Sequence, residues 1–157
     1  MLSAESLKQI DIELAKYPAD QRRSAVMAAL RIAQVEQGYL KPEAIEFVTD
    51  YIGMAPVAAY EVATFYNMYD LAPVGKYKLT VCTNLPCALR GGVDAAQYLQ
   101  QKLGIGFGET TSDGLYTLME GECMGACGDA PVMLVNNHKM CSFMTEEAIE
   151  AKLAELN

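Results

Sequence analysis

Four of the five cysteines form two closely spaced pairs, and these pairs constrain the chain more than any other sequence feature. Cys82 and Cys87 enclose four residues, and Cys123 and Cys127 enclose three. Residues 88–122, 35 in all, separate the pairs, which is enough for a helix and a strand that return the chain to the same place. Thiolates are soft ligands that select iron–sulfur clusters or zinc. The pattern favours a [2Fe–2S] cluster, with one iron held by each pair or by a mixture of the two.

Two other kinds of cysteine site fit the spacing less well. Structural zinc sites favour Cys-x2-Cys knuckles, and neither pair has that spacing. A dithiol oxidoreductase places its reactive pair as Cys-x-x-Cys at the start of a helix, which is also absent here. Zinc therefore stays as an alternative in which the chain would be an interaction or assembly subunit.

Composition excludes several functional classes. The chain has 157 residues, of which 52% are hydrophobic, and its formal net charge is −8. This acidity argues against nucleic-acid binding. No secretion signal or apolar run of about 18 residues is present, so we expect no membrane insertion and a reducing compartment in which cysteines stay thiols or metal ligands.

The first half of the chain shows helical periodicity in four short segments. Apolar residues recur at helical spacing, and proline or glycine marks most segment ends. The predicted helices cover residues 3–17, 20–38, 42–53 and 56–68. They predict a helical N-terminal domain over residues 1–72, with residues 71–75 as the linker that leaves it.

The second half shows strand periodicity, and both cysteine pairs follow strands. The predicted elements are a strand at 76–81, a helix at 86–103, a loop at 104–114, a strand at 115–120, a hairpin of 132–135 and 138–143, and a helix at 145–156. This β-α-β-β-α order is that of a thioredoxin-like fold. Adjacent parallel strands end at one sheet edge, where both cysteine pairs would meet. We therefore predict an α+β (α/β) chain, a helical bundle followed by a thioredoxin-like domain over residues 76–157.

Several motifs together resemble a known family. They are Val81 to Cys87 with Arg90-Gly91-Gly92, Glu122 to Cys127 with Ala130-Pro131, Gln37 to Leu40, Glu61 to Tyr66, and Thr110 to Gly114. Over nearly its whole length the chain resembles the thioredoxin-like [2Fe–2S] ferredoxin subunit of bacterial NADH–quinone oxidoreductase, respiratory complex I. Gly128-Asp129 and the segment 138–143 depart from the family pattern, and neither includes any of the four paired cysteines.

The resemblance implies a specific function. Cys82, Cys87, Cys123 and Cys127 would hold one [2Fe–2S] cluster that exchanges single electrons with FMN on a partner flavoprotein subunit, which also binds NADH. The chain would contact other peripheral-arm subunits and serve a proton-translocating NADH:quinone oxidoreductase, with no catalytic residue beyond the cluster. It would be cytoplasmic, held at the cytoplasmic face of the bacterial inner membrane through the complex. The alternatives are an equivalent subunit of an NAD-linked hydrogenase or formate dehydrogenase, and a stand-alone thioredoxin-like ferredoxin.

The remaining candidate residues have structural interpretations. We expect Cys141 to pack as a small hydrophobe and His138 to lie at the solvated surface. The glycines at 104, 106 and 108 follow a helix, so they fit neither phosphate-binding loop and NADH and FMN should bind elsewhere. We assign the aromatic group Phe65, Tyr66 and Tyr69 to the helical core first, and to a partner-covered surface as the alternative.

Overall fold

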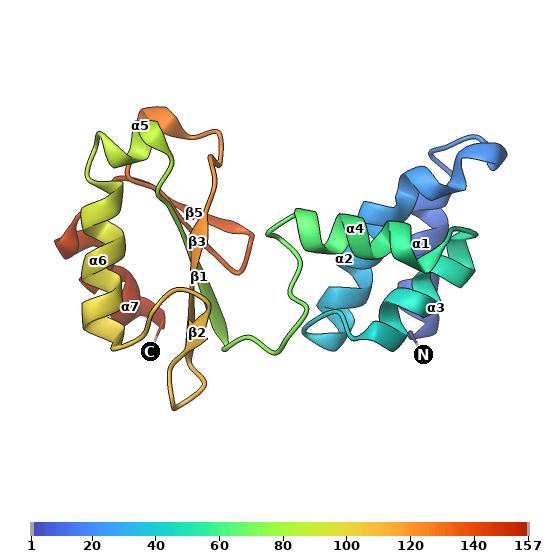
Figure 1. Cartoon of the computed structure of the whole chain (residues 1–157), viewed down its shortest axis with the longest axis horizontal. Coiled ribbons are helices and arrows are strands. Elements are labelled where there is room, and N and C mark those ends of the chain that lie inside the picture. The colour runs from blue at the N-terminus through green and yellow to red at the C-terminus, as the bar shows by residue number, and fades with distance from the viewer. Residues whose placement is uncertain (1, 157) are drawn as a thin grey trace. The chain divides into compact units, whose positions relative to one another are not determined.

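The computed structural model describes residues 2–156. The chain divides into two compact units, Met1–Pro73 and Val74–Asn157. The first unit is helical, and the second is a sheet with helices packed on it (Figure 1). Within residues 2–156, no helix is both long enough and apolar enough to cross a membrane.

The helical unit follows the predicted helices closely, with one change near its start. Its elements are α1 (Ala4–Leu14), the 3₁₀-helix η1 (Ala19–Ala25), α2 (Val26–Gln37), α3 (Pro42–Ile52) and α4 (Pro56–Phe65). The Ser3 hydroxyl caps α1 by accepting a hydrogen bond from the Ser6 amide at 3.2 Å. The second α-helix begins at Val26 instead of Asp20. Arg22 in η1 donates to the Tyr51 carbonyl at 3.0 Å, a tertiary contact that helical periodicity does not encode.

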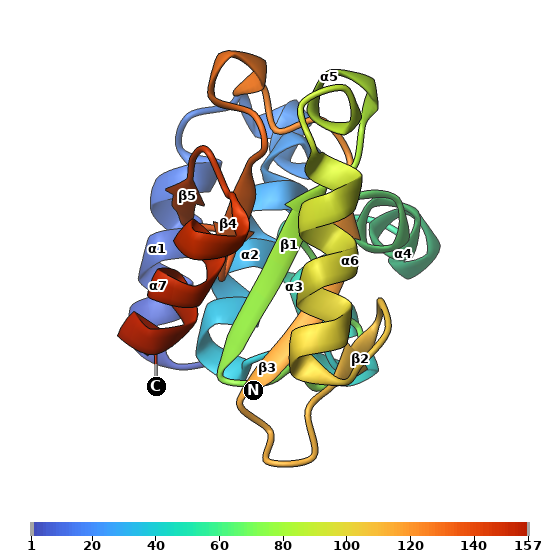
Figure 2. The same cartoon turned by 90° about the vertical axis from the view of Figure 1, so that its left-hand side faces the viewer.

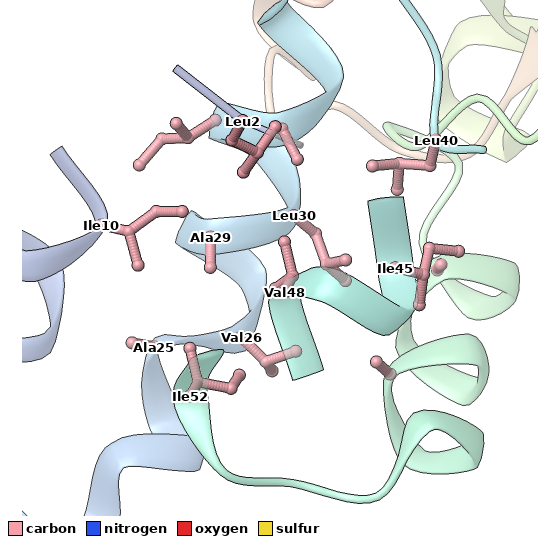
Figure 3. Close-up of a cluster of buried hydrophobic side chains, with 14 of the residues drawn as sticks. Leu2, Ile10, Ala25, Val26, Ala29, Leu30, Leu40, Ile45, Val48 and Ile52 are labelled. Atoms are coloured by element: carbon pink, nitrogen blue, oxygen red, sulfur yellow. The ribbon is translucent and has the colours of Figure 1, made fainter. Parts of the chain in front are cut away.

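The core of this unit consists of the apolar faces of its helices. Figure 3 shows side chains from several helices of the unit pointing toward one another. The most completely buried large ones are at most 1% exposed, and they are Ile10, Leu30, Ile45, Val48 and Ile52. Burial of each such side chain contributes about 1.5–3 kcal/mol before cavity effects. The helical spacing of apolar residues therefore marks the buried faces of α1, α2 and α3.

The aromatic group near the end of α4 does not form a single core cluster, so this prediction is wrong for two of its three members. Phe65 is 79% exposed and Tyr66 42% exposed, whereas Tyr69 is buried and donates its hydroxyl to the Met27 carbonyl at 2.9 Å. Ala59 and Ala63 form the buried face of α4. Phe65 lies two residues after Ala63, on the opposite side of the helix. The helix ends at Phe65, so helical spacing no longer places the residues after it.

The second unit contains a five-stranded mixed sheet with strand order β2-β3-β1-β4-β5. Its elements are β1 (Tyr77–Cys82), α5 (Leu85–Ala88), α6 (Gly92–Leu103), β2 (Glu109–Thr110), β3 (Tyr116–Gly121), the 3₁₀-helix η2 (Cys127–Asp129), β4 (Met133–Val135), β5 (Lys139–Cys141) and α7 (Glu146–Leu156). β1 pairs parallel with β3, and the other pairings are antiparallel. The thioredoxin-like arrangement predicted from the order of elements is confirmed.

Helices α6 and α7 cover the same face of the sheet (Figure 2). Leu79 and Val81 of β1 and Leu118 of β3 point into this layer together with Leu99 of α6 and Ile149 of α7. Lys78 and Thr80, on the opposite face of β1, are also buried, at 2% and 4% exposure. The alternation in β1 therefore identifies the helix-covered face. Its polar positions, however, do not mark a solvent-exposed face, because they are buried too.

Two features of the second unit differ from the sequence prediction. The single helix predicted at 86–103 is two helices. α5 ends at Ala88, and Gly91, with a left-handed φ of 89°, is the N-cap at which α6 begins. The predicted loop at 104–114 contains the two-residue strand β2. The hairpin turn is as predicted, with φ of 51° at Asn136 and 60° at Asn137, as a tight hairpin turn requires.

The contrast between Leu30 and Phe65 gives a first prediction. We expect Leu30→Ala to lower the free energy of unfolding by about 2–5 kcal/mol, because it leaves a cavity in a closed core. We expect Phe65→Ala to change it by no more than about 0.5 kcal/mol, because the side chain is exposed. Urea unfolding followed by circular dichroism measures both. Equal losses in the two variants would contradict the exposed position of Phe65.

Candidate metal centre

Parallel pairing of β1 and β3 brings the two cysteine segments together. In the register of this pair Cys82 lies opposite Gly121, the residue that ends β3 two positions before Cys123. The Thr83 amide continues the pairing by donating to the Gly121 carbonyl at 3.3 Å. On the other side, the Cys82 amide donates to the Val132 carbonyl at 3.1 Å. Both loops therefore leave the sheet at the same edge, as predicted.

Two side-chain hydrogen bonds join the first cysteine loop to the second. Thr83 Oγ1 donates to Glu120 Oε1 at 2.6 Å, and Asn84 Nδ2 donates to Glu122 Oε2 at 2.7 Å. Hydrogen bonds to ionised carboxylates are stronger than neutral ones, so these two contacts hold the loops in register beyond the last strand residues. These two hydrogen bonds were not predicted from the sequence. Their only local signal was an acidic residue on either side of Gly121 and two small polar residues after Cys82.

The two cysteine pairs have different environments. Cys82 and Cys87 are each 1% exposed and pack with Ala130, Val132 and the partly buried Met124. Cys123 and Cys127 are exposed. One side of the site is therefore shielded by apolar side chains, and the other side reaches the surface.

The sulfur geometry of the exposed pair suits a tetrahedral ion. The Sγ atoms of Cys123 and Cys127 lie 3.7 Å apart. Two sulfurs bonded to one tetrahedral ion at about 2.3 Å would be about 3.8 Å apart. The Gly125 amide donates to Cys123 Sγ at 3.4 Å, the kind of contact that tunes a thiolate ligand.

Among residues 2–156, no group of three or more histidine, cysteine, aspartate or glutamate side chains is arranged to hold a single metal ion. A four-cysteine zinc site binds one ion through four thiolates, whereas a [2Fe–2S] core presents two irons to two pairs of thiolates.

The thiols of the site affect one another's protonation. Burial, and then the neighbouring Cys82, raises the pKa of the Cys87 thiol. The hydrogen bond with Cys123 raises the pKa of Cys127, and burial adds to this effect. Adjacent thiolates repel each other, so positive charge must lie between them before all can ionise. Iron supplies that charge when it binds.

Helix α6 presses directly on the first cysteine loop. A Cβ atom on Gly92 would lie 2.8 Å from the Cys82 carbonyl oxygen and 2.9 Å from the Cys87 carbonyl. These are backbone atoms that cannot rotate away. The Gly91-Gly92 pair, which would weaken an isolated helix, is needed for this close approach.

The other two candidate residues lie where sequence analysis placed them. Cys141 is 6% exposed and packs in the core between the sheet and α7, where burial raises the pKa of its thiol. His138 is exposed in the turn between β4 and β5. Neither takes part in the contacts of the cysteine loops just described.

The fold and the two cysteine loops define a thioredoxin-like iron–sulfur protein. The chain matches the family described as thioredoxin-like [2Fe-2S] ferredoxin over residues 10–157, and it belongs to this family. Its cofactor is accordingly a [2Fe–2S] cluster, which the paired sulfurs fit.

Relatives with known names are similar over most of their length. NADH-quinone oxidoreductase subunit 2 of Thermus thermophilus is 44% identical over 142 residues, which cover 90% of this chain and 78% of the relative. A subunit of the NADH-quinone oxidoreductase of Rickettsia typhi is 42% identical over 153 residues, which cover 97% of this chain and 87% of the relative.

A solved structure shares the fold. A chain of an NAD+-reducing [NiFe]-hydrogenase in the H2-reduced state superposes with a TM-score of 0.70 at 20% identity, covering 83% of this chain. This chain spans 22% of that hydrogenase chain, so the likeness concerns one part of a larger protein.

The close approach of α6 gives a second prediction. Helix propensity alone favours alanine over glycine at position 92. The contacts with the Cys82 and Cys87 backbone outweigh this preference, so the substitution becomes destabilising. We expect Gly92→Ala to lower the free energy of unfolding by about 1–3 kcal/mol or more and to lower the iron content per chain. Thermal unfolding and iron analysis measure the two effects.

Gly128→Ala is the matched control, because a Cβ there has no neighbour within 4 Å. We expect it to leave stability and iron content near the wild-type values. A stable, fully loaded Gly92→Ala protein would show that the first cysteine loop does not depend on α6.

Proposed function

We propose that this chain is the electron-carrier subunit of an NADH dehydrogenase module in NADH–quinone oxidoreductase. The observation that carries the proposal is its similarity to oxidoreductase subunits at 41–47% identity over most of both chains. Its partner would be the flavoprotein subunit that binds FMN and NADH, together with other subunits of the peripheral arm. The hydrogenase likeness at 20% identity concerns the fold, so it does not favour the hydrogenase alternative.

We assign the cluster ligands to Cys82, Cys87, Cys123 and Cys127. The 3.7 Å separation of the Cys123 and Cys127 sulfurs supports one iron at that pair, which leaves the buried Cys82–Cys87 pair for the other. When bound, a [2Fe–2S] cluster supplies a one-electron store between a flavin and further carriers.

The chain's own residues would control access to that store. Met124, Ala130 and Val132 exclude water from the buried pair. The exposed Cys123–Cys127 pair leaves a short path to the surface for an electron. Exposed carboxylates at Glu120 and Glu122 add negative charge nearby, which lowers the reduction potential.

The two compact units support a division into a helical domain, residues 1–72, and a thioredoxin-like [2Fe–2S] domain, residues 76–157. With no spanning helix among residues 2–156, attachment to the cytoplasmic face of the membrane would come through the complex. The helical domain would then serve assembly, since the candidate ligands all lie in the other unit.

The test is an electron paramagnetic resonance spectrum of the anaerobically purified chain before and after dithionite, with iron and zinc measured on the same sample. We expect no signal when oxidised, a rhombic spin-half signal when reduced, and about two irons per chain. Wild-type chain co-expressed with the flavoprotein subunit should accept electrons when NADH is added. Zinc without a signal would remove electron transfer and leave an assembly role.

Cysteine substitutions give a third prediction. We expect Cys82→Ser or Cys127→Ser to abolish or shift the visible absorption of the cluster, because each removes a thiolate ligand. Cys141→Ser is the matched control and should keep the absorption, since Cys141 packs in the core. A colourless Cys141→Ser protein that is still folded would overturn the ligand assignment.

A further inference from the structure

A groove lies between the edge strand β5 and helix α7. β5 is the last strand in the order β2-β3-β1-β4-β5, so among residues 2–156 no further strand covers its outer side. Figure 2 shows α7 beside this strand. The groove has a volume of about 330 Å³. Small-molecule sites occupy about 300–1,000 Å³, so the groove is large enough for a small organic ligand.

Small side chains on α7 leave this space open. Ala148 and Ala151 are three residues apart, so they lie on one face of the helix, and both line the groove. Cys141 and Met144 also line it, and they are buried at 6% and 3% exposure, so they belong to its floor. The inner part of the groove is therefore apolar. A leucine in place of either alanine would fill much of it.

Two lysines at the groove converge on a single carboxylate. Lys139 Nζ donates to Glu155 Oε1 at 2.6 Å, and Lys152 Nζ donates to Glu155 Oε2 at 2.5 Å. Each oxygen of this carboxylate therefore has its own ammonium donor. All three side chains line the groove. The arrangement is that of a carboxylate-binding site in which Glu155 is the resident carboxylate.

The charges of this ion group do not balance. Two ammonium groups share one carboxylate, which leaves one excess positive charge in a chain whose formal net charge is −8. The side chain of Lys152 is only 16% exposed, so its charge is partly removed from water. Exposed ion pairs stabilise a fold weakly, so stability alone does not explain two lysines on one carboxylate. A partly buried cation is more favourable with a further anion beside it.

Glu155 is placed where another carboxylate can replace it. It belongs to the last turn of α7, which ends at Leu156, and helix ends fray. Its side chain is 52% exposed, so it can turn into water. The hydrogen bonds with Lys139 and then Lys152 lower the pKa of Glu155 to about 2, because both ammonium groups favour the charged carboxylate. A ligand carboxylate would gain the same two contacts.

Shape and charge together define the class of ligand. Separate ammonium donors for the two oxygens select an organic acid over a neutral molecule. The apolar floor favours a ligand whose body is hydrocarbon. At about 30 Å³ for each water-sized group, the groove admits about ten non-hydrogen atoms. The ligand is therefore a small carboxylic acid with a compact apolar body.

We propose that the groove between β5 and α7 binds a small organic acid with a compact apolar body. Lys139 and Lys152 hold its carboxylate, the body lies over Ala148 and Ala151, and Glu155 occupies the carboxylate position when the ligand is absent. This binding site goes beyond the electron-carrier role and does not depend on which complex the chain serves. It uses none of the four paired cysteines.

The test follows para-fluorobenzoate by fluorine NMR in the presence of the full chain with its cluster. We expect saturable binding with a Kd on the order of 1 mM, because the ligand is small and the groove is open. Fluoroacetate keeps the charge but lacks the apolar body, and para-fluorobenzyl alcohol keeps the body but lacks the charge. Each should bind at least about tenfold more weakly than para-fluorobenzoate.

Variants of the groove separate its parts. Glu155→Gln should bind para-fluorobenzoate several-fold more tightly, because the competing charge is removed. Lys152→Gln should weaken binding about tenfold through the loss of one ammonium donor, and Ala151→Leu should do the same by filling the groove. Lys102→Gln is the matched control, since Lys102 pairs with Glu150 of the same helix at 2.7 Å, outside the groove. It should bind as the wild type does.

Several results would overturn the proposal. One is the absence of saturable binding in both the wild type and Glu155→Gln. Another is equal binding of the three probes, because neither charge nor body would then be recognised. Equal losses in Lys102→Gln and Lys152→Gln would reduce the effect to general charge. Ala151 is exposed, so its leucine variant should keep the wild-type melting temperature, and unchanged affinity in that folded variant would place the ligand elsewhere.

Discussion

Parallel hydrogen bonding between β1 and β3 is the constraint on which the rest of the site depends. It places Cys82 opposite Gly121 and so starts both cysteine loops from one sheet edge. Parallel strands need a crossover, and α6 supplies it while packing on the sheet. Because Gly92 has no side chain, the start of this helix also touches the backbone of the first loop. Fold and metal centre are therefore built by the same contacts.

The site combines protection with access. Its inner pair of cysteines is shielded by apolar side chains, and its outer pair is exposed near acidic residues in the sequence. An electron carrier needs only a short path to its partner, which the exposed pair provides.

Local patterns predicted most of the elements. They failed where a contact between distant residues, or the end of a helix, decided the structure. Ile10, Leu30 and Ile45 are buried as helical spacing requires, because one face of each helix must leave water. Phe65 was misplaced because α4 ends there and its buried face is formed by small alanines. The helix across 86–103 was predicted as one because periodicity cannot register a left-handed Gly91. Strand β2 was not predicted, because two residues are too few to show an alternating pattern.

The sequence by itself determined the chemistry of this protein: four thiols in two pairs, each pair placed after a strand, in the order of elements of a thioredoxin-like fold. Ligand type and spacing are local properties that can be read along a chain. The tertiary structure alone decided which pair is buried and how Thr83 and Asn84 bind the carboxylates of the other loop. These depend on residues more than ten positions apart, whose distances only the packed sheet and helices establish.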